Sequence, residues 1–252
     1  MHVHRLAIGR AQVSIFPTIA ELFSAAGGEF FSVVTTALQQ RDAANIALSG
    51  GSTPRSLYEL IGKRAVSEPA LKQIDWRKVH LFFGDERSVP PSDKESNYRM
   101  VRESLLSNAS LGAAHVHRIH AELPPAQAAE QYEADLKQHF GSDLPRFDLI
   151  LLGLGPDGHT ASLFPGTAGL NVTDRSVIAN DVPQQHTTRI TFTYPVLNHA
   201  SEVLFLVAGA EKSASMARAL NTRDVPAARV EPNGRLLWFA DATAGAELMR
   251  KR

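Results

Sequence analysis

Short apolar runs that alternate with segments of helical periodicity constrain the fold of this chain more than any other feature. The run at 147–152, Phe-Asp-Leu-Ile-Leu-Leu, has the length and the lack of alternation that are typical of a strand buried on both faces of a parallel sheet. Strands that alternate with helices predict an α/β fold with an open, mostly parallel sheet flanked by helices on both faces. The strand-like runs cover residues 45–48, 79–83, 147–152, 177–179, 189–192, 203–207 and 236–239.

The segments between these runs contain recognisable helix starts. Thr18 with Glu21 three residues later has the pattern of a capping box. Thr53 before a proline and Ser96 are further N-cap candidates. Because the 252 residues contain no internal repeat, low-complexity tract or long linker, we expect one α/β domain over 1–252. Helices are predicted at 18–40, 54–64, 96–107, 124–140, 211–220 and 241–250.

The composition excludes several classes of function. Lys and Arg together number 26, as do Asp and Glu, so no overall field attracts nucleic acid or an anionic membrane surface. The absence of cysteine excludes disulfides, thiolate nucleophiles and zinc–thiolate sites. No apolar stretch has the length of a signal peptide or of a membrane-spanning helix, so we expect a cytoplasmic protein.

The segment 48–54, Leu-Ser-Gly-Gly-Ser-Thr-Pro, joins a short strand to a helix. Gly50 and Gly51 permit a close approach of the backbone, and the hydroxyls of Ser52 and Thr53 add hydrogen-bond donors. Such a loop suits a phosphate at the positive end of a helix dipole, although an ordinary turn with a threonine cap explains the segment equally well. No lysine follows the glycines as in a Walker loop.

Two cations from other parts of the chain are candidates to complete a phosphate site. Arg189 opens the strand-like run Arg-Ile-Thr-Phe, and Lys212 follows the run at 203–207. Lys212 lies in the first turn of a predicted helix, where the dipole disfavours a cation, and an anionic ligand would account for its position. A solvated surface lysine is the alternative.

The segment 153–165 is the strongest candidate for catalysis because it places Asp157 and His159 on a glycine-rich loop at the end of a predicted strand. Histidine has an ordinary pKa of about 6.5, so a neutral imidazole can take up a proton near neutral pH. The same segment matches the dinucleotide-binding pattern GxGxxG, with Asp181 at the spacing of a ribose ligand. The charge of Asp157 and the Pro165-Gly166 pair, which ends any helix after one turn, argue against that interpretation.

A second polar loop follows the run at 79–83 and carries Asp85, Glu86 and Arg87. We expect Arg87 to face the site, where its planar donors suit a substrate oxygen, and Glu86 to anchor the loop. Asn97 or Arg99, at the start of the next helix, are further candidates, with a plain helix N-terminus as the alternative.

Three histidines, His115, His117 and His120, form the other visible cluster. On a strand the first two share a face, as a metal site requires, but no carboxylate lies at a matching spacing. We therefore expect an exposed or edge-strand segment and no metal.

These motifs together resemble the 6-phosphogluconolactonase family, within the larger group that includes glucosamine-6-phosphate deaminase and isomerase. Four motifs occur in the order of the family, which is far more specific than any one of them. They are 48–54, 83–87 with Ser-Asn-Tyr at 96–98, 153–165, and Gly-Ala-Glu-Lys at 209–212.

The resemblance implies a Rossmann-like fold and hydrolysis of 6-phospho-D-glucono-1,5-lactone to 6-phosphogluconate in the oxidative pentose phosphate pathway, without metal or organic cofactor. It also implies phosphate binding by the 50–53 loop with Lys212, and catalysis centred on His159. In this hypothesis His159 activates a water, Arg87 stabilises the oxyanion, and Asp85 and Asp157 have supporting roles. The expected partner is a small sugar-phosphate lactone, and the expected state is a monomer or weak homo-oligomer.

Two alternatives belong to other classes. Deaminases of the larger group resemble Gly-His-x-Ala-Phe-Asn-Glu-Pro, with a glutamate before the proline that assists ring opening. Phe164 occupies that position here and cannot transfer protons, which favours lactone hydrolysis. The other alternative is a non-catalytic sugar-phosphate sensor, against which the retention of Asp157 and His159 argues.

Overall fold

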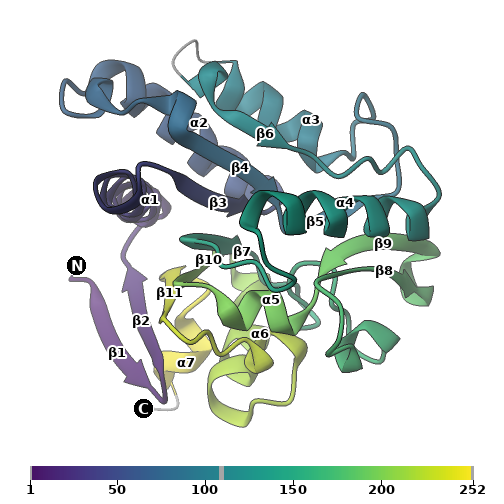
Figure 1. The fold of residues 1–252 in the computed structure, drawn as a ribbon. Coiled ribbons are helices and arrows are strands. Elements are labelled where there is room, and N and C mark those ends of the chain that lie inside the picture. Colours follow the sequence, from purple (N-terminus) through teal and green to yellow (C-terminus); the bar gives the residue numbers. More distant parts are fainter. Residues whose placement is uncertain (1, 108–110, 251–252) are drawn as a thin grey trace.

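The structure, a computed structural model, describes residues 2–107 and 111–250 and contains two sheets (Figure 1). The main sheet has eight strands in the order β1-β2-β11-β10-β7-β3-β4-β6, and the second has three in the order β5-β9-β8. The strands are β1 (His4–Ile8), β2 (Ala11–Phe16), β3 (Ala44–Leu48), β4 (Val79–Phe83), β5 (Asp85–Arg87), β6 (His115–His117), β7 (Leu149–Leu152), β8 (Val177–Val182), β9 (Thr187–Phe192), β10 (Glu202–Val207) and β11 (Arg235–Asp241).

Helices flank the main sheet, as the alternating sequence pattern predicts. The capping box of Thr18 and Glu21 is confirmed, and Ser96 accepts a hydrogen bond from the backbone of Arg99. Turns of π-helix at 102–106 and 218–222 extend α3 and α6. The helices are α1 (Ile19–Arg41), α2 (Ser52–Ser67), α3 (Asn97–Val101), α4 (Pro125–Phe140), α5 (Tyr194–His199), α6 (Ser213–Ala217) and α7 (Ala246–Arg250).

The main sheet is parallel throughout apart from the antiparallel pair β1–β2. The central strands carry the core: every residue of β7 and of β10 is buried. From β3 the chain proceeds outward to β4 and β6, whereas from β7 it proceeds to β10 and β11 on the other side. The neighbours β3 and β7 therefore form a topological switch point, where open α/β sheets bind their ligands.

The structure corrects four details of the sequence interpretation. The N-terminal hairpin β1–β2 was not predicted, and the segment 241–245 is a turn held by the Asp241 carboxylate, which accepts from the backbone of Ala244, so only 246–250 is helical. The runs at 177–179 and 189–192 belong to the separate antiparallel sheet, since β8 and β9 pair with each other and with β5. The predicted Thr53 cap is wrong, because α2 begins at Ser52 with Gly51 as its N-cap.

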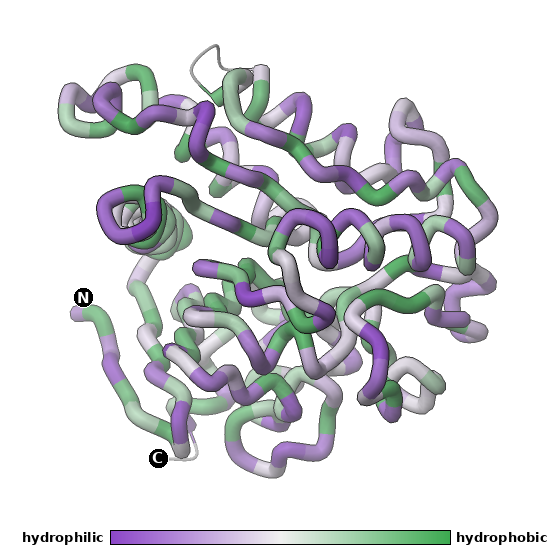
Figure 2. The backbone as a smooth tube through the Cα atoms, viewed as in Figure 1, coloured by the Kyte–Doolittle hydropathy of each residue, from purple (hydrophilic) through white to green (hydrophobic). Residues whose placement is uncertain are grey.

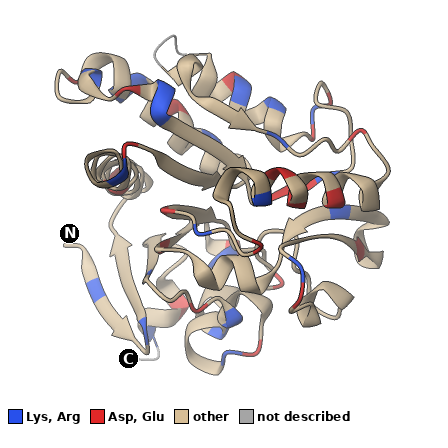
Figure 3. Ribbon diagram, in the orientation of Figure 1, with Lys and Arg blue, Asp and Glu red and all other residues tan. Residues whose placement is uncertain are grey.

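Hydrophobic and hydrophilic residues alternate along the helices, as expected for helices that each bury one face (Figure 2). Acidic and basic residues are interspersed along the ribbon and do not gather in one large region (Figure 3). Within the described residues, every helix is too short or too polar to cross a membrane.

Candidate active site

The loops that follow four adjacent parallel strands, β10, β7, β3 and β4, meet in one cleft of about 280 Å³. Nine of the ten residues predicted for the site line this cleft. The tenth, Asp157, stands behind the imidazole of His159. Residues up to 162 positions apart in the chain, from Gly50 to Lys212, therefore share one surface. The nine are Gly50, Gly51, Ser52, Thr53, Asp85, Arg87, His159, Arg189 and Lys212.

The glycine loop after β3 brings the first turn of α2 to the cleft. Tyr58 fixes the start of this loop, because its buried hydroxyl accepts from the backbone N–H of Ser49 at 3.0 Å and donates to the carbonyl of Ser49 at 2.9 Å. Gly51 has φ +109°, a conformation that favours glycine, and no side chain caps the helix. The backbone N–H groups of the first turn are therefore not used by a side-chain cap, which leaves them available to an anion.

Residue 50 must be a glycine for a different reason, which is its close contact with Asn97. A Cβ atom on Gly50 would overlap the side-chain amide of Asn97, which is buried. That amide donates to the backbone carbonyl of Asp85 at 2.9 Å, so it connects the loop after β3 to the loop after β4. The absence of a side chain at residue 50 keeps these two loops together.

We predict that Gly50→Ala lowers both stability and activity. The added methyl group must displace the Asn97 amide, and overpacking of this kind costs about 1–3 kcal/mol. Gly28→Ala is the matched control, because a Cβ at Gly28 in α1 meets no atom within 4 Å and the change favours the helix by about 0.5–1 kcal/mol. Urea denaturation measures both variants. Equal stability of the two would remove Gly50 from this account.

Three cations surround the cleft. Arg87 and Arg189 are paired residues of the antiparallel strands β5 and β9, and both have a buried Nε with no partner among the described residues. Burial, and next the charge of Arg87, lowers the pKa of Arg189. Lys212 follows β10 in a short turn that leads into α6. Two neighbouring guanidinium groups with unused donors are a favourable environment for an anionic substrate.

The acidic residues after β4 hold the loops in place. Glu86 is buried and accepts from the backbone N–H groups of Asn97 at 2.7 Å and Tyr98 at 2.8 Å, which confirms its predicted anchoring role. Burial raises the pKa of Glu86 in spite of these hydrogen bonds. Asp85 lines the cleft, and its Oδ2 accepts from Ser162 Oγ at 2.6 Å. Asp85 therefore connects the loop after β4 to the loop after β7.

Hydrogen bonds to Asp157 hold the imidazole of His159 in one orientation. Nδ1 of His159 lies 2.6 Å from Oδ1 of Asp157, and the same oxygen accepts from the His159 backbone N–H at 3.1 Å. Burial alone would raise the pKa of Asp157, but the hydrogen bonds from His159 lower it. A carboxylate at Nδ1 places the ring proton there and leaves Nε2 with a lone pair. The arrangement is that of a histidine base oriented by a carboxylate.

The rest of the loop shapes the space around this imidazole. Phe164 stacks on His159 with ring centroids 4.0 Å apart, and a Cβ atom on Gly155 would collide with the imidazole. Ala161 has φ +47°, a strained conformation for a residue with a side chain, next to Ser162, which bonds Asp85. The sequence interpretation did not assign Ser162 or Ala161 to the site, although both lie within the motif at 153–165.

Two sequence candidates lie elsewhere. Arg99 turns away from the cleft, since its guanidinium bonds Glu103 at 2.7 Å and the carbonyl of Ser92 at 2.8 Å. The dinucleotide hypothesis fails because residues 153–165 form turns and only a four-residue 3-10 helix, Ala168–Asn171, follows them. Asp181, its predicted ribose ligand, lies on β8 of the other sheet and accepts from Thr188.

The fold and the cleft define an α/β protein whose ligand site, at the switch point of a parallel sheet, combines an uncapped helix start, three cations and a carboxylate-oriented histidine. That combination is suited to small anionic substrates that need a proton acceptor. Residues 17–238 match the model of the family described as glucosamine-6-phosphate isomerases/6-phosphogluconolactonase. The chain belongs to this family.

Individual relatives agree with the assignment. The chain is 40% identical over 244 residues to a 6-phosphogluconolactonase of Nostoc sp., covering 94% of this chain and 98% of the relative. It is 41% identical over 223 residues to one of Synechocystis sp., covering 85% and 89%. The solved 6-phosphogluconolactonase of Thermotoga maritima is similar with a TM-score of 0.78 at 29% identity, covering 92% of this chain and 99% of that one. A monomeric glucosamine-6-phosphate deaminase shares the fold, with a TM-score of 0.75, 17% identity and coverage of 93% and 99%.

Proposed function

We propose that this protein is a 6-phosphogluconolactonase, which hydrolyses 6-phospho-D-glucono-1,5-lactone to 6-phospho-D-gluconate. The observation that carries the proposal is the single cleft lined by the glycine loop, by Lys212 and by His159. A substrate with a phosphate at one end and an electrophilic carbonyl at the other needs both an anion-binding site and a general base. The 40% identity to a relative with this name, over nearly the whole of both chains, supports the same reaction.

The phosphate is bound by the loop of residues 50–53 together with Lys212 and Arg189. Backbone N–H groups at the start of α2 and the hydroxyls of Ser52 and Thr53 supply donors, and the two cations supply charge. Because the phosphate takes no part in bond breaking, its binding energy serves to position the lactone ring.

The chemical step is an attack of water on the lactone carbonyl. Nε2 of His159 accepts a proton from the water as the oxygen–carbon bond forms, and Asp157 stabilises the resulting imidazolium through Nδ1. The carbonyl oxygen gains negative charge in the tetrahedral intermediate, which Arg87 stabilises. Breakdown of the intermediate expels the ring oxygen, and the imidazolium returns its proton to that oxygen. Asp85 supports the site by holding Ser162.

The direct test is a pH-stat assay on freshly prepared 6-phosphogluconolactone, run beside glucosamine 6-phosphate. We expect acid release from the lactone well above the spontaneous rate, and no ammonia from the amino sugar. Phe164 is packed against His159 where the deaminase pattern has a glutamate, so the cleft lacks that proton-transfer group. Release of ammonia would favour the deaminase alternative, and binding without turnover of either compound would favour the sensor.

We also predict that chelation leaves lactonase turnover unchanged. The proposed steps use an imidazole, guanidinium groups and backbone donors, and no step is assigned to a metal ion. The measurement compares initial rates before and after dialysis against EDTA, with re-addition of Mg²⁺ or Zn²⁺ as the control. A loss of activity that a metal restores would show that the mechanism is incomplete.

The remaining features of the proposal concern the whole molecule. We propose a single domain over 1–252, a cytoplasmic location, and a monomer or weak homo-oligomer that binds no nucleic acid. The pairing of β5 with β9, about a hundred residues apart, supports one folding unit. One calorimetric unfolding transition and a monomer mass by light scattering are expected. Two separate transitions would contradict the single domain.

A further inference from the structure

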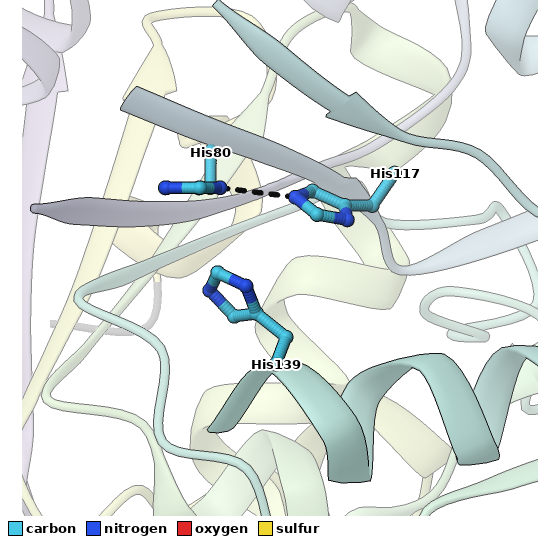
Figure 4. A group of neighbouring side chains, drawn as sticks. All are labelled: His80, His117 and His139. Atoms are coloured by element: carbon cyan, nitrogen blue, oxygen red, sulfur yellow. Dashed lines mark hydrogen bonds between the residues drawn. The ribbon is translucent and has the colours of Figure 1, made fainter. Parts of the chain in front are cut away.

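A cluster of three histidines lies outside the cleft, on a part of the main sheet that the proposed reaction does not use (Figure 4). His80 comes from β4, His117 from β6 and His139 from the last turn of α4. One ring nitrogen from each lies within 4.8 Å of the other two. We propose that these three imidazoles bind a divalent transition-metal ion of the Zn²⁺ type.

The separations of the nitrogens are close to those of a tetrahedral site. Zn–N bonds of about 2.0–2.1 Å place two ligand nitrogens about 3.3 Å apart. In the structure Nδ1 of His80 lies 3.0 Å from Nε2 of His117, and the largest separation within the group is at most 4.8 Å. The His139 ring faces the other two in Figure 4, and its centroid lies 4.5 Å from that of His80 and 5.0 Å from that of His117.

The surroundings of His139 prepare one nitrogen for a metal. Its Nε2 lies 2.7 Å from the amide oxygen Oδ1 of Asn45. An amide oxygen only accepts, so Nε2 carries the ring proton and Nδ1 keeps a free lone pair. Metal-binding histidines are commonly oriented in this way by an acceptor at the second nitrogen.

His80 and His117 change their hydrogen bond when a metal binds. In the metal-free state one of the two facing nitrogens donates to the other. With a metal, both lone pairs point at the ion, and each ring carries its proton on the outward nitrogen. The stacking of Phe82 on His117 at 4.3 Å and of His115 on His80 at 4.8 Å holds both rings in the required direction.

The donor set selects the kind of ion. Three imidazoles and no carboxylate suit Zn²⁺, Co²⁺, Ni²⁺ or Cu²⁺ and disfavour Mg²⁺ and Ca²⁺. Each histidine would donate the lone pair of a neutral imidazole to the ion. All three side chains are half-buried and so remain partly accessible to solvent, and a tetrahedral ion held by three imidazoles would take a water as its fourth ligand.

The position of the cluster indicates a structural role. β6 is the last strand of the sheet, and an ion at this place would tie it to β4 and to the end of α4. Of the three histidines that the sequence analysis singled out, only His117 belongs to this cluster, together with His80 and His139. His120 bonds Glu122 instead. This proposal departs from the sequence-based expectation of no metal. It is independent of the lactonase proposal, because none of the three residues lines the cleft.

The test uses untagged, EDTA-treated full-length protein titrated with Co²⁺ and with Zn²⁺. We expect one ion per chain, visible absorption typical of tetrahedral Co²⁺ that Zn²⁺ displaces, and a higher Tm with Zn²⁺. His117→Asn should abolish the Co²⁺ absorption, and Asn45→Ala should weaken binding by about 10- to 100-fold. Lactonase activity should be unchanged in His117→Asn.

Two matched controls locate the ion. His120→Asn removes a histidine outside the cluster, and His159→Asn removes the one in the cleft, so both should bind the metal normally. Because variants of the cluster can lose stability, histidine ring nitrogens of the wild-type protein are also followed by ¹⁵N NMR. Zn²⁺ should shift those of His80, His117 and His139. Loss of binding in His159→Asn, unshifted cluster resonances, or no binding at stoichiometric concentration would overturn the proposal.

Discussion

His159→Asn should lower the turnover of 6-phosphogluconolactone by about 10² or more, the effect of losing a general base, with little change in KM. In the proposed mechanism the imidazole takes up a proton in the transition state, whereas the phosphate is bound by other residues that line the cleft, the 50–53 loop and Lys212. Asparagine retains a hydrogen-bonding group toward Asp157 but cannot take up the proton. Initial rates corrected for spontaneous hydrolysis give the comparison.

The control for this variant is His120→Asn, which changes a half-buried histidine that bonds Glu122 and does not line the cleft. It should leave kcat and KM unchanged. Because Asp157 acts through His159, Asp157→Asn should also reduce kcat, by less than the loss of the imidazole itself. Wild-type turnover in His159→Asn would remove this residue from the mechanism.

Lys212→Ala should raise KM for the phosphorylated lactone by about 10- to 100-fold, the value of one or more hydrogen bonds to a charged group. The same change should have little effect on unphosphorylated gluconolactone, which has no phosphate to bind. Lys212 lies in the turn after β10 and lines the same cleft as the glycine loop at 50–53, although the two are far apart in the sequence. Kinetics on both substrates, with each variant, measure the difference.

An exposed lysine of α2 provides the control. Lys63→Ala removes a charge of the same kind from the helix whose start forms the phosphate loop, but at a position outside the cleft. It should leave both KM values unchanged. Equal losses for the two substrates in Lys212→Ala would mean that the lysine acts on something other than the phosphate.

Much of the fold was predictable because its central strands are uniformly apolar. The runs that became β3, β4, β7, β10 and β11 are found within two residues of their predicted bounds, and β4 matches its bounds at both ends. The hairpin β1–β2 was missed because β1 is largely exposed and has no apolar face that stands out. The sequence does contain one signal for this hairpin, which is Gly9. In the structure this glycine has φ +56° in the tight turn between β1 and β2.

The convergence of the contiguous motifs on one cleft was predictable from the sequence. Gly50–Thr53, Asp85–Arg87 and Asp157–His159 each follow a buried strand, and the carboxyl ends of parallel strands meet at one edge. The contacts between motifs were not predictable, because they depend on how distant strands pair. The neighbouring guanidinium groups of Arg87 and Arg189 result from the pairing of β5 with β9, which no local pattern reveals.

The Thr53 cap shows how a local rule fails at the loop that is proposed to bind the phosphate. Threonine before proline is typical of a helix start, but the helix begins at Ser52, and its first turn has no side-chain cap. Unused backbone donors at a helix start weaken a fold slightly and bind an anion well. Departures from local rules of this kind are expected where a chain binds its ligand.

The most direct test of the account is a crystal structure with the product 6-phosphogluconate. The account predicts the phosphate against the backbone of residues 50–53 and the ammonium of Lys212, with the C1 carboxylate next to Nε2 of His159 and the guanidinium of Arg87. The reverse orientation, with the phosphate at His159, or a product bound outside this cleft, would contradict it.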